Sequence, residues 1–141
     1  MLSRSGIHAV RALVALANVS DGDYKGAALL ADETDAPPNY LGKLLQALSR
    51  EGLVESQKGL GGGFRLARAP EEITMYDVVR SIEDIRRWTQ CLFGGDGCSD
   101  GNPCAVHHRW AVVRESYLEM MKTTRLVDLL PTENHRGTNP L

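Results

Sequence analysis

Residues 37–52 read PPNYLGKLLQALSREG, and this stretch decides which fold the chain can adopt. The two prolines suit the first turn of a helix, and Gly52 suits the position just beyond its end. Leucines recur between them at helical spacing, and polar side chains gather in the first half. The leucines are Leu41, Leu44, Leu45 and Leu48, and the polar residues are Asn39, Tyr40, Lys43 and Gln46. The pattern predicts a helix that buries its leucines and exposes polar groups near its start.

The residues upstream supply a partner for this helix. A short helix is predicted over residues 26–33, and residues 34–36 form a turn of three residues before the prolines. Two helices joined in this way, the second presenting polar residues from its start, describe a helix-turn-helix. Further upstream, residues 7–19 show apolar side chains at helical spacing, with Ser5 as the expected N-cap. This helix is rich in alanine and can pack closely against others.

A glycine-rich hairpin is predicted directly after the second helix. Residues 53–56 and 64–67 are short strand candidates on either side of the segment QKGLGGG, residues 57–63. A hairpin in this place is the wing of a winged helix, and Lys58 at its tip can reach phosphates or a minor groove. The glycine run is not followed by Gly-Lys-Ser/Thr and a helix, which argues against a nucleotide-phosphate loop.

The charge distribution agrees with a DNA-binding surface in this region. The chain carries a net charge of −2, which taken whole argues weakly against nucleic acid. Residues 39–68, however, contain five basic and two acidic side chains, a local charge of +3, so the remainder carries −5. The basic excess therefore lies on the predicted helix and wing.

All three cysteines of the chain lie in one loop, residues 91–108, which reads CLFGGDGCSDGNPCAVHH. Glycine, asparagine and proline between the cysteines favour a loop. Three thiols exclude a closed disulfide framework, and thiolates select zinc, copper(I) or iron–sulfur clusters, with an imidazole able to complete the set. We therefore predict a metal or cluster site at Cys91, Cys98 and Cys104. The acids Asp96 and Asp100 are interpreted as residues that solvate the loop.

The rest of the chain is predicted to be helical. Thr74 caps a helix over residues 75–85, and a long helix follows the cysteine loop over residues 105–123. Its apolar stripe suggests a homodimer seam, with packing onto the first helix as the alternative. The stripe consists of Val106, Trp110, Val113, Tyr117 and Met120. A short helix is expected over residues 126–130, and a disordered tail over residues 131–141.

These elements predict a mainly α fold: a winged helix-turn-helix with a two-stranded β-wing and a long C-terminal dimerisation helix. The expected regions are residues 1–70 for DNA binding, 71–130 for the cysteine loop and dimerisation helices, and 131–141 for the tail. We expect no signal peptide and no membrane span, and free thiols favour the reducing cytoplasm.

The chain resembles the Rrf-type winged-helix transcriptional regulators, the group that includes the iron–sulfur assembly repressor, the nitric-oxide-sensing repressor and the cysteine-metabolism repressor. Four segments carry the resemblance, in the order of the family. They are HAVRALVALA in the first helix, NYLGKLLQALSREGLV in the recognition helix, GLGGGFRLARAPEEITMYDVVRSIE through the wing, and the C-x6-C-x5-C loop.

This resemblance implies a homodimer that binds a pseudo-palindromic operator in double-stranded DNA and holds a [2Fe–2S] or [4Fe–4S] cluster. The fourth ligand of the assembly repressor falls on His107, with His108 as its competitor. The fourth ligand of the nitric-oxide sensor falls on Ile7, which cannot ligate iron. In that arrangement only the neighbouring His8 of the partner chain could be the fourth ligand. The DNA-reading positions of the family fall on Pro37, Asn39, Tyr40, Lys43 and Lys58.

The resemblance implies a regulator rather than an enzyme, with redox, nitric oxide or iron status as the signal at the cluster. Two alternatives keep the DNA binding. One is a Cys3His zinc site, and the other is a thiol redox sensor without a cluster. A small electron-transfer enzyme would leave the helix-turn-helix without a purpose.

Overall fold

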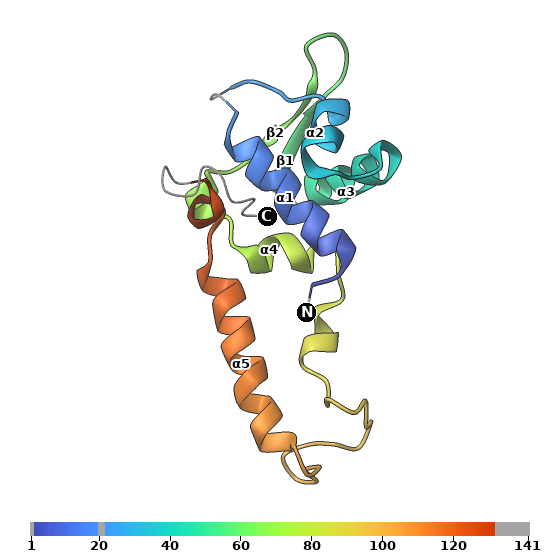
Figure 1. The fold of residues 1–141 in the computed structure, drawn as a ribbon, viewed down its shortest axis with the longest axis vertical. Helices are drawn as coiled ribbons and strands as arrows, with labels where there is room; N and C mark the ends of the chain where they lie inside the picture. The colour runs from blue at the N-terminus through green and yellow to red at the C-terminus, as the bar shows by residue number, and fades with distance from the viewer. Residues whose placement is uncertain (1, 20–21, 132–141) are drawn as a thin grey trace.

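The structure of the protein is a computed structural model that describes residues 2–19 and 22–131. Helices dominate, and the two strands form one antiparallel sheet, as the sequence predicts (Figure 1). The elements are α1 (Arg4–Ala17), α2 (Ala27–Thr34), α3 (Pro38–Arg50), β1 (Val54–Gln57), β2 (Gly63–Leu66), η1 (Pro70–Glu72), α4 (Met75–Arg80), η2 (Ile85–Trp88), α5 (His107–Thr123) and η3 (Leu126–Leu129).

Helix α1 forms the centre of the core. It contacts α2, α3, α4, β2 and η3, and its inward face is almost completely buried. Ala9, Ala12 and Leu13 on this face are 0% exposed. Alanine adds little bulk beyond the backbone, so neighbouring elements approach α1 closely from several sides. The helix begins at Arg4 with Ser3 as N-cap, two residues before the predicted cap Ser5, because the Ser3 hydroxyl accepts the N–H of Gly6.

Helices α2 and α3 form the predicted helix-turn-helix. Asp35 ends α2 in the left-handed conformation (φ 52°) and turns the chain toward Pro37, the N-cap of α3. The four leucines of α3 face the core, as their spacing predicts. The turn and the leucine stripe together fix which face of α3 remains in solvent.

The wing is a hairpin in which β1 and β2 pair from Val54 with Leu66 to Gln57 with Gly63. Both strands lie one residue from the predicted ranges. Strand β2 is bound to the segment just before α2 through Phe64, whose backbone exchanges two hydrogen bonds with Lys25 (2.8 and 2.9 Å). A Cβ at Gly63 would overlap the Lys25 carbonyl, so this close approach requires glycine. The tip of the wing, by contrast, projects freely, with Leu60 fully exposed.

Helix α4 is shorter than the sequence predicts. Thr74 and Asp77 form the expected capping box, but the helix ends at Arg80 rather than near Ile85. The N–H groups of Ile82 and Glu83 both bond to the Val79 carbonyl, and the Glu83 side chain turns back toward α1. A tertiary contact therefore ends the helix where the local apolar pattern would continue it.

Helix α5 extends away from α4, and the cysteine loop lies at its far end (Figure 1). Its C-terminal half is anchored by the buried Met121 and by Tyr117, which packs edge-on against Trp88 with ring centroids 5.3 Å apart. Val113 and Met120 of the predicted stripe instead face solvent. Part of the predicted stripe, Tyr117, thus packs on the chain's own core, whereas Val113 and Met120 form an uncovered face.

Within the described residues, no helix combines the length and apolar character that a bilayer span requires. Ten residues of the predicted tail, 132–141, lie outside the described part of the chain.

Replacing Leu13 by Ala should lower the free energy of unfolding by about 2–5 kcal/mol, because it leaves a cavity at a fully buried position on the inward face of α1. The matched control is Leu60→Ala at the wing tip, which should stay within about 0.5 kcal/mol of the parent protein because that side chain is wholly exposed. Urea unfolding followed by circular dichroism measures both. Equal effects would mean that α1 is not the centre of the core.

Candidate metal centre and nucleic-acid interface

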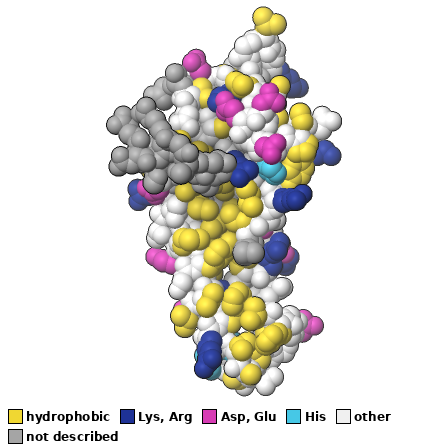
Figure 2. Space-filling view, in the orientation of Figure 1, with side chains coloured by type: hydrophobic (Ala, Val, Ile, Leu, Met, Phe, Trp, Pro, Cys, Tyr) yellow, Lys and Arg dark blue, Asp and Glu magenta, His cyan; other side chains and the backbone are white. Residues whose placement is uncertain are grey.

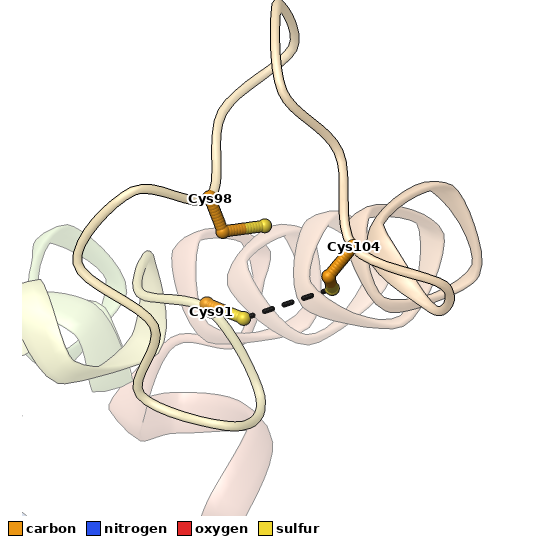
Figure 3. Close-up of side chains that lie close together, drawn as sticks. All are labelled: Cys91, Cys98 and Cys104. Carbon is orange, nitrogen blue, oxygen red and sulfur yellow. Dashed lines mark hydrogen bonds between the residues drawn. The ribbon is translucent and has the colours of Figure 1, made fainter.

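The cysteine loop, residues 91–107, brings three thiols together. The Sγ atoms of Cys91, Cys98 and Cys104 all lie within 4.8 Å of one another, and those of Cys91 and Cys104 are 3.8 Å apart. Figure 3 shows the three side chains gathered from separate arms of the loop. All three are half-buried and unpaired. Such a donor set is one that zinc, copper(I) or an iron–sulfur cluster accepts.

Tight turns in the loop set different environments for the sulfurs. Backbone N–H groups of Phe93 and Gly95 point at Cys91 and lower the pKa of its thiol to about 7. At Cys98 a backbone hydrogen bond at Cys104 lowers the pKa, but desolvation and the neighbouring thiols outweigh it, so the pKa is raised. The Cys91 thiol is thus more readily ionised than the Cys98 thiol. The thiolate is the form that binds metals.

His107, the first residue of α5, lies beside the sulfurs. Its Nδ1 atom is 3.1 Å from the Cys98 Sγ, and its Nε2 atom is 2.9 Å from an Asp100 carboxylate oxygen. The His107 side chain is only 13% exposed, and its hydrogen bond lowers the pKa of Asp100. Sequence reasoning treated Asp100 as a solvating residue and missed this contact. No sequence signal marks this contact, because it depends on the turn at residues 99–102.

His108 occupies a different position. Successive helical residues point about 100° apart, and the exposed His108 ring stands edge-on against His107 with centroids 5.2 Å apart. His107 is the imidazole whose ring nitrogen contacts a cysteine sulfur. Three thiols therefore form one donor group, which fits a soft metal ion or a cluster, and His107 lies beside one of them, the Cys98 sulfur.

A carboxylate just before the loop ties it to the start of α1. The Glu83 Oε1 atom accepts hydrogen bonds from the Ser3 backbone N–H (2.9 Å) and the Ser3 hydroxyl (2.6 Å). The side chain is 4% exposed, and its second oxygen faces Arg87 at 3.6 Å. Gly6 leaves room for it, because a Cβ at that position would overlap the carboxylate.

The same turn of α1 contacts the recognition helix. The Ser5 hydroxyl is hydrogen-bonded to the Tyr40 hydroxyl of α3, and the His8 ring packs edge-on against Tyr40 with centroids 6.0 Å apart. The His8 ring thus packs within its own chain, with its Nδ1 atom buried and without a hydrogen-bond partner among the described residues, whereas Ile7 beside it is 38% exposed. The N-terminal turn of α1 thus touches Glu83 on one side and Tyr40 on the other.

The remaining candidate DNA contacts are exposed. Pro37, Asn39 and Lys43 are exposed in the first half of α3, and Lys58 is exposed near the tip of the wing. Tyr40 is half-buried because of its contacts with α1. The cysteine loop lies at the opposite end of the molecule from the wing (Figure 1).

A helix-turn-helix followed by a β-wing defines the winged-helix DNA-binding proteins, and the thiol-rich loop sets this chain apart within that class. The chain belongs to the Rrf2 family, described as iron-dependent transcriptional regulators, whose model matches residues 2–132. It is therefore a DNA-binding transcriptional regulator, and members of this family are not enzymes. The resemblance seen in the sequence is confirmed.

Individual relatives agree with this assignment. The chain is 28% identical over 129 residues to the HTH-type transcriptional regulator NsrR of Bacillus licheniformis, covering 91% of this chain and 90% of the other. Among solved structures, T. potens IscR matches with a TM-score of 0.72 and 26% identity, covering 91% and 84% of the two chains. CymR, the global cysteine regulator of B. subtilis, matches with a TM-score of 0.75 at 24% identity, covering 92% and 95%, and this likeness concerns the fold.

Substitutions in α3 and in the wing should produce two different defects in DNA binding. Lys43→Ala should reduce the preference for a selected operator over scrambled duplex by about 1–3 kcal/mol, as expected for a lost base contact. Lys58→Ala should weaken both duplexes alike and reduce the salt dependence by about one counterion, as expected for a lost phosphate contact. Fluorescence anisotropy at several salt concentrations, with a duplex selected from a random library, measures both.

The control is Lys122→Ala, which removes the same charge from α5, away from α3 and the wing. If it weakens binding as much as either variant, the contact surface has been placed wrongly.

Proposed function

We propose that this regulator acts as a homodimer whose affinity for a pseudo-palindromic operator depends on an iron–sulfur cluster held by Cys91, Cys98, Cys104 and His107. The observation that carries the proposal is the convergence of three sulfurs within 4.8 Å of one another, with the His107 Nδ1 atom 3.1 Å from one of them. Cysteine thiolates are the usual ligands of such clusters, and histidine can replace cysteine. The family description as iron-dependent supports iron as the metal.

When bound, a [2Fe–2S] or [4Fe–4S] cluster supplies a centre whose charge and integrity change with redox state, nitric oxide or iron supply. The residues of the chain give that change a route to DNA. The cysteine loop follows η2, which begins two residues after Glu83; Glu83 holds Ser3, and the same turn of α1 holds Tyr40 in the recognition helix. A loop that is ordered in one state and released in the other biases the position of α3.

Homodimerisation rests on an uncovered apolar face. Val112, Val113 and Met120 of α5 are 64%, 57% and 47% exposed, and Leu92 and Phe93 of the loop are also exposed. Figure 2 shows hydrophobic side chains gathered in the middle of the molecule and toward the end that carries the cysteine loop. A second copy on this face would relate two recognition helices by a two-fold axis, and a pseudo-palindromic operator has the same symmetry. Under this proposal the regulator acts in the cytoplasm.

A single zinc ion is the second candidate, because of the distance between the Cys91 and Cys104 sulfurs. A tetrahedral ion with bonds of about 2.3 Å to sulfur separates its ligands by about 3.8 Å. The observed distance is 3.8 Å. Such an ion would hold the loop in the same way but would undergo no redox change itself.

Protein purified without oxygen should be brown and contain two or four irons with matching sulfide per chain. Replacing any one of the three cysteines by Ala should remove most of the visible absorption, since only three thiolates are present. Ser99→Ala, within the same loop, is the control and should leave the spectrum unchanged. Colourless protein with one zinc per chain would select the second candidate, and retention of iron and sulfide by the triple Cys→Ala variant would refute the site itself.

Gly6→Ala should uncouple the metal centre from DNA. The added methyl group displaces the Glu83 carboxylate from Ser3, so the ratio of operator affinities between cluster-loaded and cluster-free protein should fall toward one. Allosteric ratios are typically about 5–150-fold. Anisotropy titrations on both forms measure this ratio, and iron content verifies loading.

Gly26→Ala is the control for this experiment, because a Cβ there meets nothing within 4 Å. An unchanged ratio in Gly6→Ala would exclude the start of α1 as the route between the two sites.

A further inference from the structure

The loop that carries the cysteines also holds an acid against the candidate histidine ligand. Asp100 and Gly101 form the tip of a tight turn closed by two backbone hydrogen bonds between Ser99 and Asn102, 3.3 and 3.0 Å long. The Asn102 side chain bonds to the Gly97 carbonyl at 3.2 Å and braces the turn. The Asp100 side chain is fully exposed, yet its backbone is fixed. The turn therefore delivers a carboxylate to a defined place beside His107.

The two contacts of His107 decide where its ring proton lies. A carboxylate oxygen only accepts hydrogen bonds at neutral pH, so the Nε2 atom, 2.9 Å from Asp100, must carry the hydrogen. In the neutral ring the lone pair then lies on Nδ1, the atom that is 3.1 Å from the Cys98 sulfur. The Cys98 thiol can donate its hydrogen to this lone pair. A metal that binds there replaces the thiol proton, which leaves to solvent.

We propose that Asp100 is the positioning residue of the metal centre: by accepting the Nε2–H of His107, it presents Nδ1 to a metal at the three sulfurs. This inference rests on the proposed function, because it takes His107 as the fourth ligand. Asp100 does not touch the metal. It fixes the tautomer and orientation of the ring that does, and a carboxylate behind an imidazole also makes the ring a stronger donor.

The arrangement also explains why His107 rather than His108 is the ligand. Both imidazoles are at the start of α5, but the contact with Asp100 orients one of them. His108 is exposed and lies against the edge of His107 instead. The discrimination between adjacent histidines therefore comes from a residue seven positions upstream.

The first test uses metal-free protein and does not depend on a cluster. In the reduced chain, nitrogen chemical shifts of His107 should show the Nε2–H tautomer, and Asp100→Ala should yield a mixture of tautomers. Asp96→Ala, which removes the same charge from the same loop, should leave the tautomer unchanged. A mixture already present in the parent protein would overturn the inference.

The second test measures how long the cluster survives. After anaerobic loading with iron and sulfide, Asp100→Ala should lose its visible absorption to a chelator about 10–100-fold faster than the parent, the usual effect of removing such a partner. Asp100→Asn keeps an acceptor oxygen, so its cluster should be lost at a rate between those of the parent and Asp100→Ala. Asp96→Ala should lose its cluster at the rate of the parent. The reduction potential should rise in Asp100→Ala, because the ring becomes a weaker donor.

A double-variant comparison separates this inference from the proposed function. In a His107→Ala background, Asp100→Ala should have no further effect, because the group that it positions is gone. If His107→Ala accelerates cluster loss while Asp100→Ala behaves like Asp96→Ala, His107 remains the ligand and the inference is refuted. If His107→Ala has no effect while Cys98→Ala abolishes the cluster, the fourth ligand has been assigned wrongly, and the inference is refuted with it.

Discussion

The close packing of α1 against its neighbours is the constraint on which the rest of the structure depends. Its inward face carries Ala9 and Ala12 where larger side chains would hold other elements away. Because both are completely buried, α2, α3, α4 and β2 all reach the same helix. Protein interiors are packed as densely as organic crystals, so even one added methylene is felt by the surrounding elements. Movement at either end of α1 is therefore passed to the elements beside it.

Contacts from the recognition helix and from the segment that precedes the cysteine loop converge on the start of this helix. Ser3 is held by Glu83, which precedes the cysteine loop, and Ser5 is held by Tyr40, which belongs to the recognition helix. Gly6 stands between them with no side chain to obstruct the carboxylate. A link of this kind requires residues far apart in sequence to share one helical turn, and only the packing of α1 brings them there.

The sequence was sufficient for features that depend on neighbours along the chain. Leucine spacing predicted the buried face of α3, prolines and Gly52 its limits, and the Thr74–Asp77 pair the start of α4. The sequence was insufficient where a contact between residues far apart in the chain determines the local structure. Helix α4 ends where Glu83 reaches Ser3, the N-cap of α1, and no local pattern encodes that contact.

The cysteine loop shows the same division. The identity of the thiols and their clustering could be predicted, because glycines and proline between them allow a loop to fold around one point. The role of Asp100 could not, since an acid in a glycine-rich loop is ordinarily hydrated. Its contact with His107 depends on a two-residue turn whose geometry the sequence leaves open.

The three thiols and His107 all come from residues 91–107, and the residues just before this loop are hydrogen-bonded to α5, Gln90 by Trp110 and Thr89 by Arg114. The hydrophobic core, by contrast, is built from residues outside the loop. Under the proposed function, filling or emptying the centre would act on one segment that contributes no residue to the core. In a zinc finger the metal decides whether the domain is folded at all. Under the proposed function, the loaded and empty chains would share this core, so the protein would be reset without being unfolded and made again.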